Sequence, residues 1–301
     1  MKELYSLLKR CELCPRRCRV DRTREQQGYC RVTDKIFISY YGKHIGEEPP
    51  ISGNRGSGNI FFSSCNMRCV YCQNYQISHT LAGIEVTIDR LAEIFLELEM
   101  EGCHNINLVS PTPYVPMILP AIEKARQKGL MVPFVYNTNA YENVKTIEHL
   151  DGYIEIFLPD FKYWNNNIAK RLSDAPDYPR HAASAILEMK KQVGDLFIRD
   201  GIAERGMLLR HLVLPNNLSG SRQILEWILT NLGNRTFLSL MSQYYPLHNA
   251  YQYPMINRRI KEREYDELIN ILIENDFENV FIQELESAST LIPNFRLEKP
   301  F

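Results

Sequence analysis

The 301-residue sequence has no excess of charge of either sign, because 35 Lys and Arg residues face 36 Asp and Glu residues, a formal net charge of -1. Proteins that attract nucleic acid or an anionic membrane by general electrostatics carry a surplus of basic residues. The richest basic stretch, 258–264, interleaves its basic residues with glutamates, as a solvated helix surface does. We therefore expect neither a nucleic acid nor a membrane as a partner.

A long uninterrupted hydrophobic run is also missing. Two stretches without charged side chains, 102–122 and 236–257, are long enough for a membrane span, but prolines interrupt both. The first ten residues mix acidic and basic side chains and lack the apolar core of a signal peptide. Eight cysteines without an export signal indicate a reducing compartment, in which thiols bind metals rather than pair. We expect a cytoplasmic protein.

Three of the eight cysteines, Cys65, Cys69 and Cys72, lie in one short stretch behind an apolar run at 59–62 that predicts a strand. Thiolates suit iron-sulfur clusters, and a loop with three of them can hold three irons of a four-iron cluster. The fourth iron is then free to bind a small molecule. A zinc site, a disulfide or buried core cysteines are the alternatives; zinc needs a fourth ligand, and His79 lies six intervening residues further on. The spacing favours the cluster.

The C-x3-C-x2-C pattern, with Tyr71 just before its last cysteine, resembles the signature of radical S-adenosylmethionine (radical SAM) enzymes. The resemblance implies a [4Fe-4S] cluster on Cys65, Cys69 and Cys72 whose open iron binds S-adenosyl-L-methionine, with Tyr71 beside the cofactor. It also implies an electron donor of the flavodoxin or ferredoxin type. The cluster passes the electron to S-adenosylmethionine, which is cleaved to methionine and a 5′-deoxyadenosyl radical.

Four further cysteines, Cys11, Cys14, Cys18 and Cys30, lie within twenty residues and have the number and proximity of a four-thiolate metal site. Zinc and an iron-sulfur cluster both fit, and unrelated free thiols are the remaining alternative. Few apolar residues lie between these cysteines, so metal binding would supply free energy that core burial cannot. We predict an N-terminal metal-binding segment with its connector at 1–50, followed by a barrel with a C-terminal extension at 51–301.

Strand and helix patterns alternate along the rest of the chain. The predicted strands are 59–62, 105–109, 131–136, 153–158, 207–214 and 237–241, and the helices between them are 87–102, 118–128, 144–149, 181–193 and 222–231. This alternation predicts an α/β fold with a parallel sheet and right-handed crossovers. Six units are fewer than the eight of a closed barrel. A partial (β/α)6 TIM-like barrel is also what the radical SAM resemblance implies, and a helix at 263–274 with a short run at 280–282 would pack beside it.

Polar residues follow the ends of the predicted strands, where ligands gather in parallel α/β folds. Asp160-Phe161-Lys162 resembles the Asp-x-Lys element of enzymes that activate glycyl-radical enzymes, typified by the pyruvate formate-lyase activating enzyme. By that resemblance, Asp160 and Lys162 would help to hold S-adenosylmethionine or a nearby cation. Asn137 and Thr138 would contribute from the adjacent strand. An ordinary surface ion pair is the alternative.

The sequence also departs from these activating enzymes. Residues 73–86 lack the additional cysteines that many of them carry, and 110–113 reads Ser-Pro-Thr-Pro in place of a Gly-Gly-Glu-like turn. The Cys-rich segment and the Gly-Glu-Glu-Pro-Pro connector resemble a branch of radical proteins related to the activators. We predict a radical SAM oxidoreductase that abstracts hydrogen from a protein or peptide. A small-metabolite substrate, or a non-enzymatic iron-sulfur electron carrier or sensor, is the alternative.

Three other chemically notable residues receive no catalytic role at this point. Arg210 and His211 are neighbours in a predicted strand, so their side chains point to opposite faces and at most one faces the barrel interior. Cys103 stands alone between a helix and a strand, and we expect it to be a buried hydrophobic residue.

Overall fold

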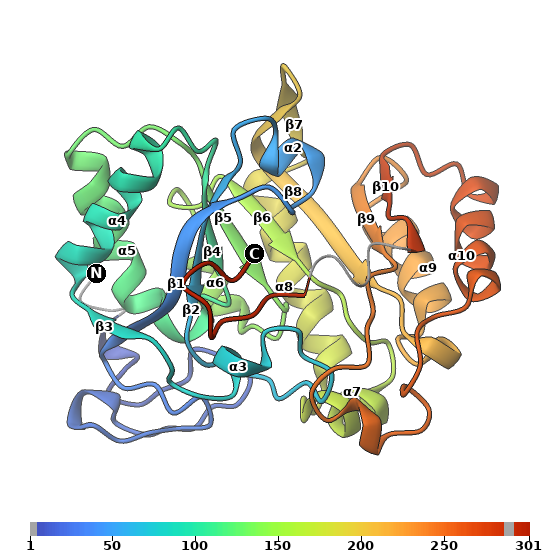
Figure 1. The fold of residues 1–301 in the computed structure, drawn as a ribbon, viewed down its shortest axis with the longest axis horizontal. Coiled ribbons are helices and arrows are strands. Elements are labelled where there is room, and N and C mark those ends of the chain that lie inside the picture. Colours follow the sequence, from blue (N-terminus) through green and yellow to red (C-terminus); the bar gives the residue numbers. More distant parts are fainter. Residues whose placement is uncertain (1–4, 286–291) are drawn as a thin grey trace.

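The computed structural model describes residues 5–285 and 292–301, whose strands form one ten-stranded sheet. Seven of these strands run parallel: β2 (Ser57–Phe62), β4 (Ile106–Val109), β5 (Phe134–Thr138), β6 (Ile156–Pro159), β8 (Ile202–Leu212), β9 (Phe237–Met241) and β10 (Val280–Ile282). The order is β10-β9-β8-β6-β5-β4-β2-β1-β3, with β7 (Phe197–Arg199) beside β8. The two end strands do not pair with each other in the described chain, so the barrel is open (Figure 1).

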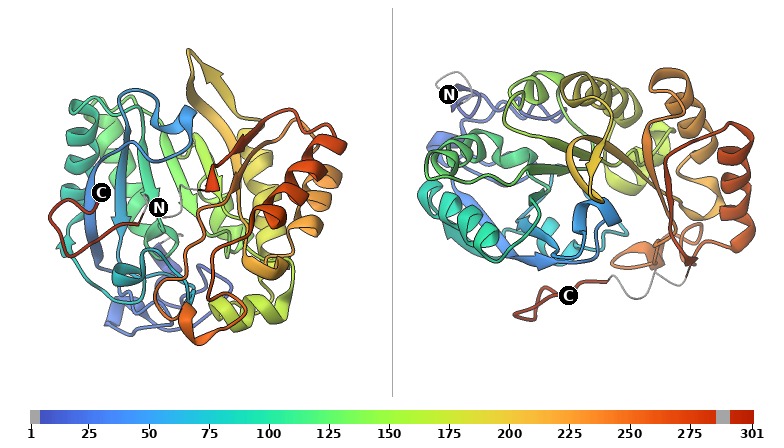
Figure 2. Two further views of the ribbon diagram at one scale, coloured as in Figure 1. Left: turned by 45° about the vertical axis from the view of Figure 1, so that its right-hand side comes forward. Right: turned by 90° about the horizontal axis from the view of Figure 1, so that it is seen from above.

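Helices cover the outer face of this curved sheet, as the view from above in Figure 2 shows. They are α4 (Ile88–Met100), α5 (Val115–Gln127), α6 (Val144–Glu148), α7 (Asn166–Ser173), α8 (Tyr178–Val193), α9 (Ser221–Asn231) and α10 (Glu262–Glu274). The first begins where the Thr87 side chain accepts a hydrogen bond from the Arg90 amide at 3.1 Å, and its buried face carries Leu91, Phe95 and Leu98. The cap and the apolar stripe explain why a helix forms at this position.

The predicted α/β partial barrel is therefore confirmed. All six predicted strands and the five helices between them exist, and the run at 280–282 adds β10 in parallel beside β9. Boundaries shift where prolines or polar residues blur the pattern: the strand expected at 131–136 begins at Phe134 and ends at Thr138. No helix in the described part of the chain has the length and apolar character that crossing a bilayer requires.

One strand near the N-terminus was missed. β1 (Ile36–His44) pairs antiparallel with both β2 and β3 (Ile84–Val86). Its residues alternate in burial along the first half, but they lie within the predicted metal-binding segment, for which no strand was expected. Because β1 is hydrogen-bonded to the barrel, the sheet extends across the predicted division at residue 50, and that division stays a prediction.

The Gly-Glu-Glu-Pro-Pro connector ends in a short helix, α2 (Pro49–Ser52), for which no helix was predicted. Ile51 of this helix packs inside the barrel against the inward-facing residues Val135, Ile156 and Leu208. Its carbonyl accepts a hydrogen bond from Asn105 at 2.7 Å, next to the start of β4. The helix therefore fills the barrel where the strands begin, and the interior remains hollow where they end.

Candidate active site

The three cysteines of the predicted signature lie in the loop after β2 and line one cavity. This cavity opens to solvent at the carboxyl ends of the strands. The loop is held against the end of α7, because the amides of Arg68 and Val70 donate to the carbonyls of Ser173 and Leu172 at 3.0 and 2.9 Å. Main-chain pairing with a helix fixes the loop better than side chains alone would.

Each cysteine sulfur has a polar neighbour. The sulfur of Cys65 accepts from Asn139 Nδ2 at 3.2 Å and from the Met67 amide at 3.4 Å, that of Cys69 accepts from Ser173 Oγ at 3.0 Å, and that of Cys72 lies 3.2 Å from Ser78 Oγ. Hydrogen bonds to cluster-ligating sulfurs orient them and tune the reduction potential. The surroundings of the three sulfurs therefore suit thiolate ligands.

Burial keeps these thiols protonated in the absence of a metal. It raises the pKa of Cys65 and Cys72, and it raises the pKa of Cys69 to about 11, while the Lys162 ammonium acts on all three in the opposite direction. Coordination to a metal deprotonates a thiol outright and removes this penalty. Three buried or partly buried thiols around one cavity, each with a polar neighbour and one common cation, fit a cluster.

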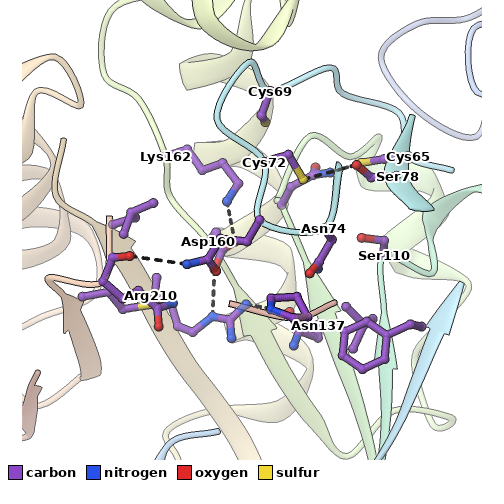
Figure 3. Close-up of a pocket in the computed structure, with 18 of the residues that line it drawn as sticks. Cys65, Cys69, Cys72, Asn74, Ser78, Ser110, Asn137, Asp160, Lys162 and Arg210 are labelled. Carbon is purple, nitrogen blue, oxygen red and sulfur yellow. Dashed lines mark hydrogen bonds and ion pairs between the residues drawn. The ribbon is translucent and has the colours of Figure 1, made fainter. Parts of the chain in front are cut away.

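Asp160 lies between two cations at the end of β6. Its Oδ2 accepts from Lys162 Nζ at 2.6 Å and its Oδ1 accepts from Arg210 Nε at 2.7 Å. Figure 3 shows the two cations on opposite sides of the carboxylate, with the three cysteines on the side of Lys162. Only 12% of the Asp160 side chain is exposed, and 15% and 13% of the two cations, so the surface ion pair considered earlier is excluded.

The ionic contacts continue from Arg210 to the inner end of the connector. Arg210 also donates to Asn137 Oδ1 at 2.6 Å and lies 3.3 Å from Glu47 Oε2. The other carboxylate oxygen of Glu47 accepts from Asn59 and Asn107 at 2.8 and 2.9 Å. A polar layer therefore crosses the barrel interior from β2 to β8, directly beneath the cavity.

These contacts keep all three central groups ionised. Burial acts to raise the pKa of Asp160, but Arg210 and Lys162 outweigh it and hold that pKa below its usual value. Burial likewise opposes the charge of Lys162, yet Asp160 raises the pKa of the ammonium. The Arg210 pKa is also raised, because Asp160, Glu48 and Glu47 outweigh its burial. The cavity therefore has a fixed ionic floor.

Known proteins have sequences similar to the part of the chain that forms this site. The sequence profile of the Radical SAM superfamily matches residues 59–199, which include the three cysteines and Asp160. The uncharacterized protein MJ0674 of Methanocaldococcus jannaschii is 31% identical over 276 residues, which cover 88% of this chain and 75% of the relative. The chain belongs to the radical SAM superfamily. A second uncharacterized protein of that organism, MJ0808, is 22% identical, and the match covers 95% of this chain and 85% of MJ0808.

Solved structures agree with the fold of this radical SAM chain. SuiB of Streptococcus suis, bound to its precursor peptide SuiA, aligns with a TM-score of 0.52 at 13% identity, covering 78% of this chain and 51% of SuiB. The FeFe-hydrogenase maturase HydG of Carboxydothermus hydrogenoformans gives 0.50 at 12% identity and covers 76% and 54%. The protein anSMEcpe with bound AdoMet and a Kp18Cys peptide gives 0.50 at 15% identity, covering 78% and 62%. The chain spans about half the length of the first structural relatives it matches.

Two predicted cofactor-binding residues of the radical SAM chain have hydroxyl groups that are engaged elsewhere. The Tyr71 hydroxyl lies 2.5 Å from that of Tyr163, although its ring borders the cavity. Thr138 donates its hydroxyl to Glu142 at 2.6 Å, on the face of β5 opposite to Asn137. All five predicted cofactor-binding residues border the cavity, but the hydroxyl groups of Tyr71 and Thr138 are directed to protein partners.

Sequence reasoning gave no role in the site to Glu47, Asn139 or Arg210. Asn139 directly follows two predicted residues, and its contact with Cys65 shows that the whole strand end is used. Of the two neighbours in β8, Arg210 faces the cavity and His211 faces away, fully buried, with ring nitrogens 2.6 and 2.8 Å from the Phe161 carbonyl and Ser221. The alternation predicted that at most one would face inward. Cys103 is 1% exposed, as expected for a buried hydrophobic residue.

The four N-terminal cysteines also line one cavity. Cys11, Cys14, Cys18 and Cys30 line a small cavity next to the signature loop, and none of them forms a disulfide. In the described ranges, 5–285 and 292–301, no three Cys, His, Asp or Glu side chains are arranged to hold a single metal ion. The metal site predicted here, zinc or iron-sulfur, stays a prediction.

This N-terminal cavity is joined to the signature loop by short contacts. Ser64 donates its hydroxyl to the Cys30 carbonyl at 2.5 Å, Arg16 donates to the Asn66 carbonyl at 3.0 Å, and Arg68 donates to the Tyr29 carbonyl at 3.0 Å. The signature loop therefore connects the two groups of cysteines through direct hydrogen bonds.

Proposed function

We propose that this chain is a radical SAM oxidoreductase that abstracts hydrogen from a protein or peptide, as the activating enzymes of glycyl-radical enzymes do. The observation that carries the proposal is the convergence of Cys65, Cys69 and Cys72 on one cavity whose floor is the ion pair of Asp160 and Lys162. When bound there, a [4Fe-4S] cluster and S-adenosylmethionine would supply a 5′-deoxyadenosyl radical by one-electron reductive cleavage of the sulfonium.

The residues of the chain would position these groups and exclude water. The three cysteines would hold three irons, while Asn139, Ser173 and the backbone of Met67 would orient the sulfurs by donating to them. Lys162 is shared between Asp160 and the space beside Cys69, so it would neutralise negative charge next to the cluster. Asn137 and the Tyr71 ring would border the cofactor, and Thr138 would support them from the opposite face.

A macromolecular substrate is favoured by the neutral opening of the cavity. The cavity lining includes Phe61, Val109, Ser110, Tyr244 and Tyr245, and the lysine and arginine of the lining, which could select a phosphorylated metabolite, are paired in the ionic floor. SuiB and anSMEcpe, which share the fold, are bound to peptides. This is the support for a peptide rather than a small metabolite.

Two further parts of the proposal concern the surroundings of the reaction. A second metal, zinc or iron-sulfur, would be held by Cys11, Cys14, Cys18 and Cys30, whose shared cavity has the right donor set for four-thiolate coordination. The reducing electron would come from a flavodoxin- or ferredoxin-type protein in the cytoplasm.

The formation of 5′-deoxyadenosine tests the chemistry. The anaerobically reconstituted chain, reduced with dithionite and given S-adenosylmethionine, should release 5′-deoxyadenosine, detected by liquid chromatography. A Cys69→Ala variant should lose this activity, whereas Cys103→Ala, a buried cysteine outside the cavity, should keep it. Full cleavage by the Cys69→Ala protein would refute the assignment of the ligands.

Deuterium transfer tests the substrate class. The reduced enzyme would be incubated with deuterated candidate peptides, proteins and metabolites, and the label would be sought in 5′-deoxyadenosine. We expect transfer from a polypeptide. Transfer from a small metabolite, with none from any peptide or protein, would overturn this part of the proposal and leave the radical chemistry intact.

A further inference from the structure

The segment 292–301 lies across the mouth of the cavity. Pro293 and Phe301 are among the residues that line it. In Figure 1 the segment is the dark red trace in front of β1 and β2, well away from α10, which precedes it in the chain. The cavity that holds the signature cysteines is therefore partly closed by a piece of the protein's own chain.

The segment contacts an aromatic rim formed by Tyr40, His44 and Phe61. The Phe301 ring centroid lies 4.3 Å from that of His44, 5.4 Å from that of Phe61 and 6.4 Å from that of Tyr40. Phe295 meets Phe61 edge to face at 5.2 Å. Below the rim, Phe61 belongs to a small apolar cluster with Ile77 and Val109 that is separate from the main core. Two aromatic side chains thus cover an apolar surface inside the open barrel.

Polar attachment of the segment to this surface is slight. The backbone amide of Phe295 donates to Gln76 Oε1 at 2.7 Å, and Gln76 Nε2 donates to Asn294 Oδ1 at 3.4 Å. Other hydrogen bonds of the segment close it on itself, such as the one from the Asn294 amide to the Pro300 carbonyl at 3.0 Å. The segment is consequently a compact loop held mainly by two phenyl rings, and Phe301 itself is 49% exposed.

We propose that the aromatic rim is a docking site for an aromatic side chain of a polypeptide substrate, and that residues 292–301 occupy this site until such a polypeptide displaces them. The inference rests on the proposed function, since it names a feature of the polypeptide that the enzyme would accept. The seated segment shows that a stretch of polypeptide carrying phenylalanine and proline fits at the mouth, in the cavity that the cysteines also line. A free metabolite would use little of this surface.

Competition between the tethered segment and an incoming polypeptide follows from effective concentration. A segment of the same chain is present at its site at an effective concentration of roughly millimolar, so a segment whose own dissociation constant is about 100 µM would weaken the binding of a competing free peptide about tenfold. The displacement requires no rearrangement of the sheet, because the segment lies on the barrel rather than in its hydrogen-bonded ladder.

Peptide binding to the full-length chain tests this inference without cluster or cofactor. A fluorescein-labelled peptide with the sequence of residues 292–301 would be titrated with two proteins, the unaltered chain and a Phe295→Ala/Phe301→Ala variant whose rim is vacated. We expect the variant to bind the peptide about tenfold more tightly, by fluorescence anisotropy. Leu297→Ala, which changes an exposed residue of the same segment, should behave as the unaltered chain.

Two further measurements locate the binding. A peptide in which both phenylalanines are replaced by alanine should bind the vacated variant at least tenfold more weakly. Adding Tyr40→Ala to that variant should also weaken binding. This substitution should disturb the fold little, because Tyr40 is only partly buried. Equal binding by the unaltered and vacated chains, or binding that ignores the phenylalanines, would overturn the inference. Neither result would change the outcome expected in the 5′-deoxyadenosine assay, so each of the two proposals can be refuted without the other.

Discussion

At the scale of single residues, Asp160 is the carboxylate that two cations of the cavity floor share. Two buried cations, Lys162 and Arg210, contact its two oxygens at 2.6 and 2.7 Å. Removing one partner from a buried set of charges leaves the others without compensation, which costs far more than the loss of a solvated pair. The carboxylate is consequently essential for the stability of the cavity floor as well as for its charge.

We predict that Asp160→Asn lowers the free energy of unfolding of the metal-free chain by about 3–5 kcal/mol, because it removes the one charge shared by two buried cations. Urea denaturation at pH 7 would measure the change. The matched control is Asp89→Asn, which breaks the exposed ion pair with Lys124 at 2.7 Å and should have no measurable effect. A similar loss in both variants would contradict the role assigned to burial.

Residues of the site differ in how far sequence could identify them. The spacing of Cys65, Cys69 and Cys72 is local, so it can be recognised from the sequence alone. The element at 160–162 could also be recognised, because it follows a predicted strand. Glu47 carried no such signal, because its partner Arg210 lies 163 positions away and only the curvature of the sheet brings them together. Periodicity showed that one of Arg210 and His211 faces inward and not which one.

At the scale of elements, Glu264 anchors the start of α10. Its carboxylate accepts hydrogen bonds from both terminal nitrogens of Arg258 at 2.7 Å, from the Lys261 amide at 2.8 Å and from the Asn216 amide at 2.7 Å. One side chain therefore joins the helix, the loop before it and the turn after β8. The hydrogen bonds from Arg258 lower the pKa of Glu264 to about 2, below its ordinary value of 4.5.

A depressed carboxyl pKa stabilises the fold only where the group is ionised. The contribution of Glu264 is fully present above about pH 4.5 and is lost as the pH falls from there to about 2. Because the group is partly solvated, we expect Glu264→Gln to lower the free energy of unfolding at pH 7 by about 1–2 kcal/mol. The difference from the unaltered chain should shrink toward pH 2. The matched control is Glu267→Gln, which changes an exposed residue on the same helix and should leave the free energy of unfolding at pH 7 nearly unchanged.

Elements of the fold were predictable where hydrophobic patterns and turns agree. The buried strands β4, β5 and β6 are short apolar runs, and their helices have distinct apolar faces. β1 was overlooked because a segment rich in cysteine and arginine precedes it and drew it into the predicted metal-binding region. α2 was overlooked because its prolines indicate a connector, although proline is well tolerated in the first turn of a helix.

At the scale of the whole molecule, the N-terminal segment and the barrel meet at the signature loop. We predict that a Cys65/Cys69/Cys72 triple-alanine variant still binds one zinc ion or one iron-sulfur cluster, because Cys11, Cys14, Cys18 and Cys30 supply a complete donor set of their own. Metal analysis by mass spectrometry after anaerobic purification would show it.

The control and the contrary result are equally direct. In that triple-alanine background, Cys14→Ser should remove the remaining metal and Cys103→Ala should retain it, because Cys103 lies outside both cavities. A fully folded triple-alanine protein without metal would refute the second site. It would leave the contacts of Ser64, Arg16 and Arg68 as the means by which the segment is ordered.

The contact between Glu47 and Arg210 has a consequence for how the protein reaches its working state. Its two residues are 163 positions apart, and loop closure over such a separation is slow and comes late in folding. During synthesis, the three cysteines emerge long before β8, so they are present in the nascent chain before Arg210 can complete the ionic floor of the cavity. Loading of a cluster would therefore best follow release from the ribosome, when the last strands have docked and the thiols are enclosed.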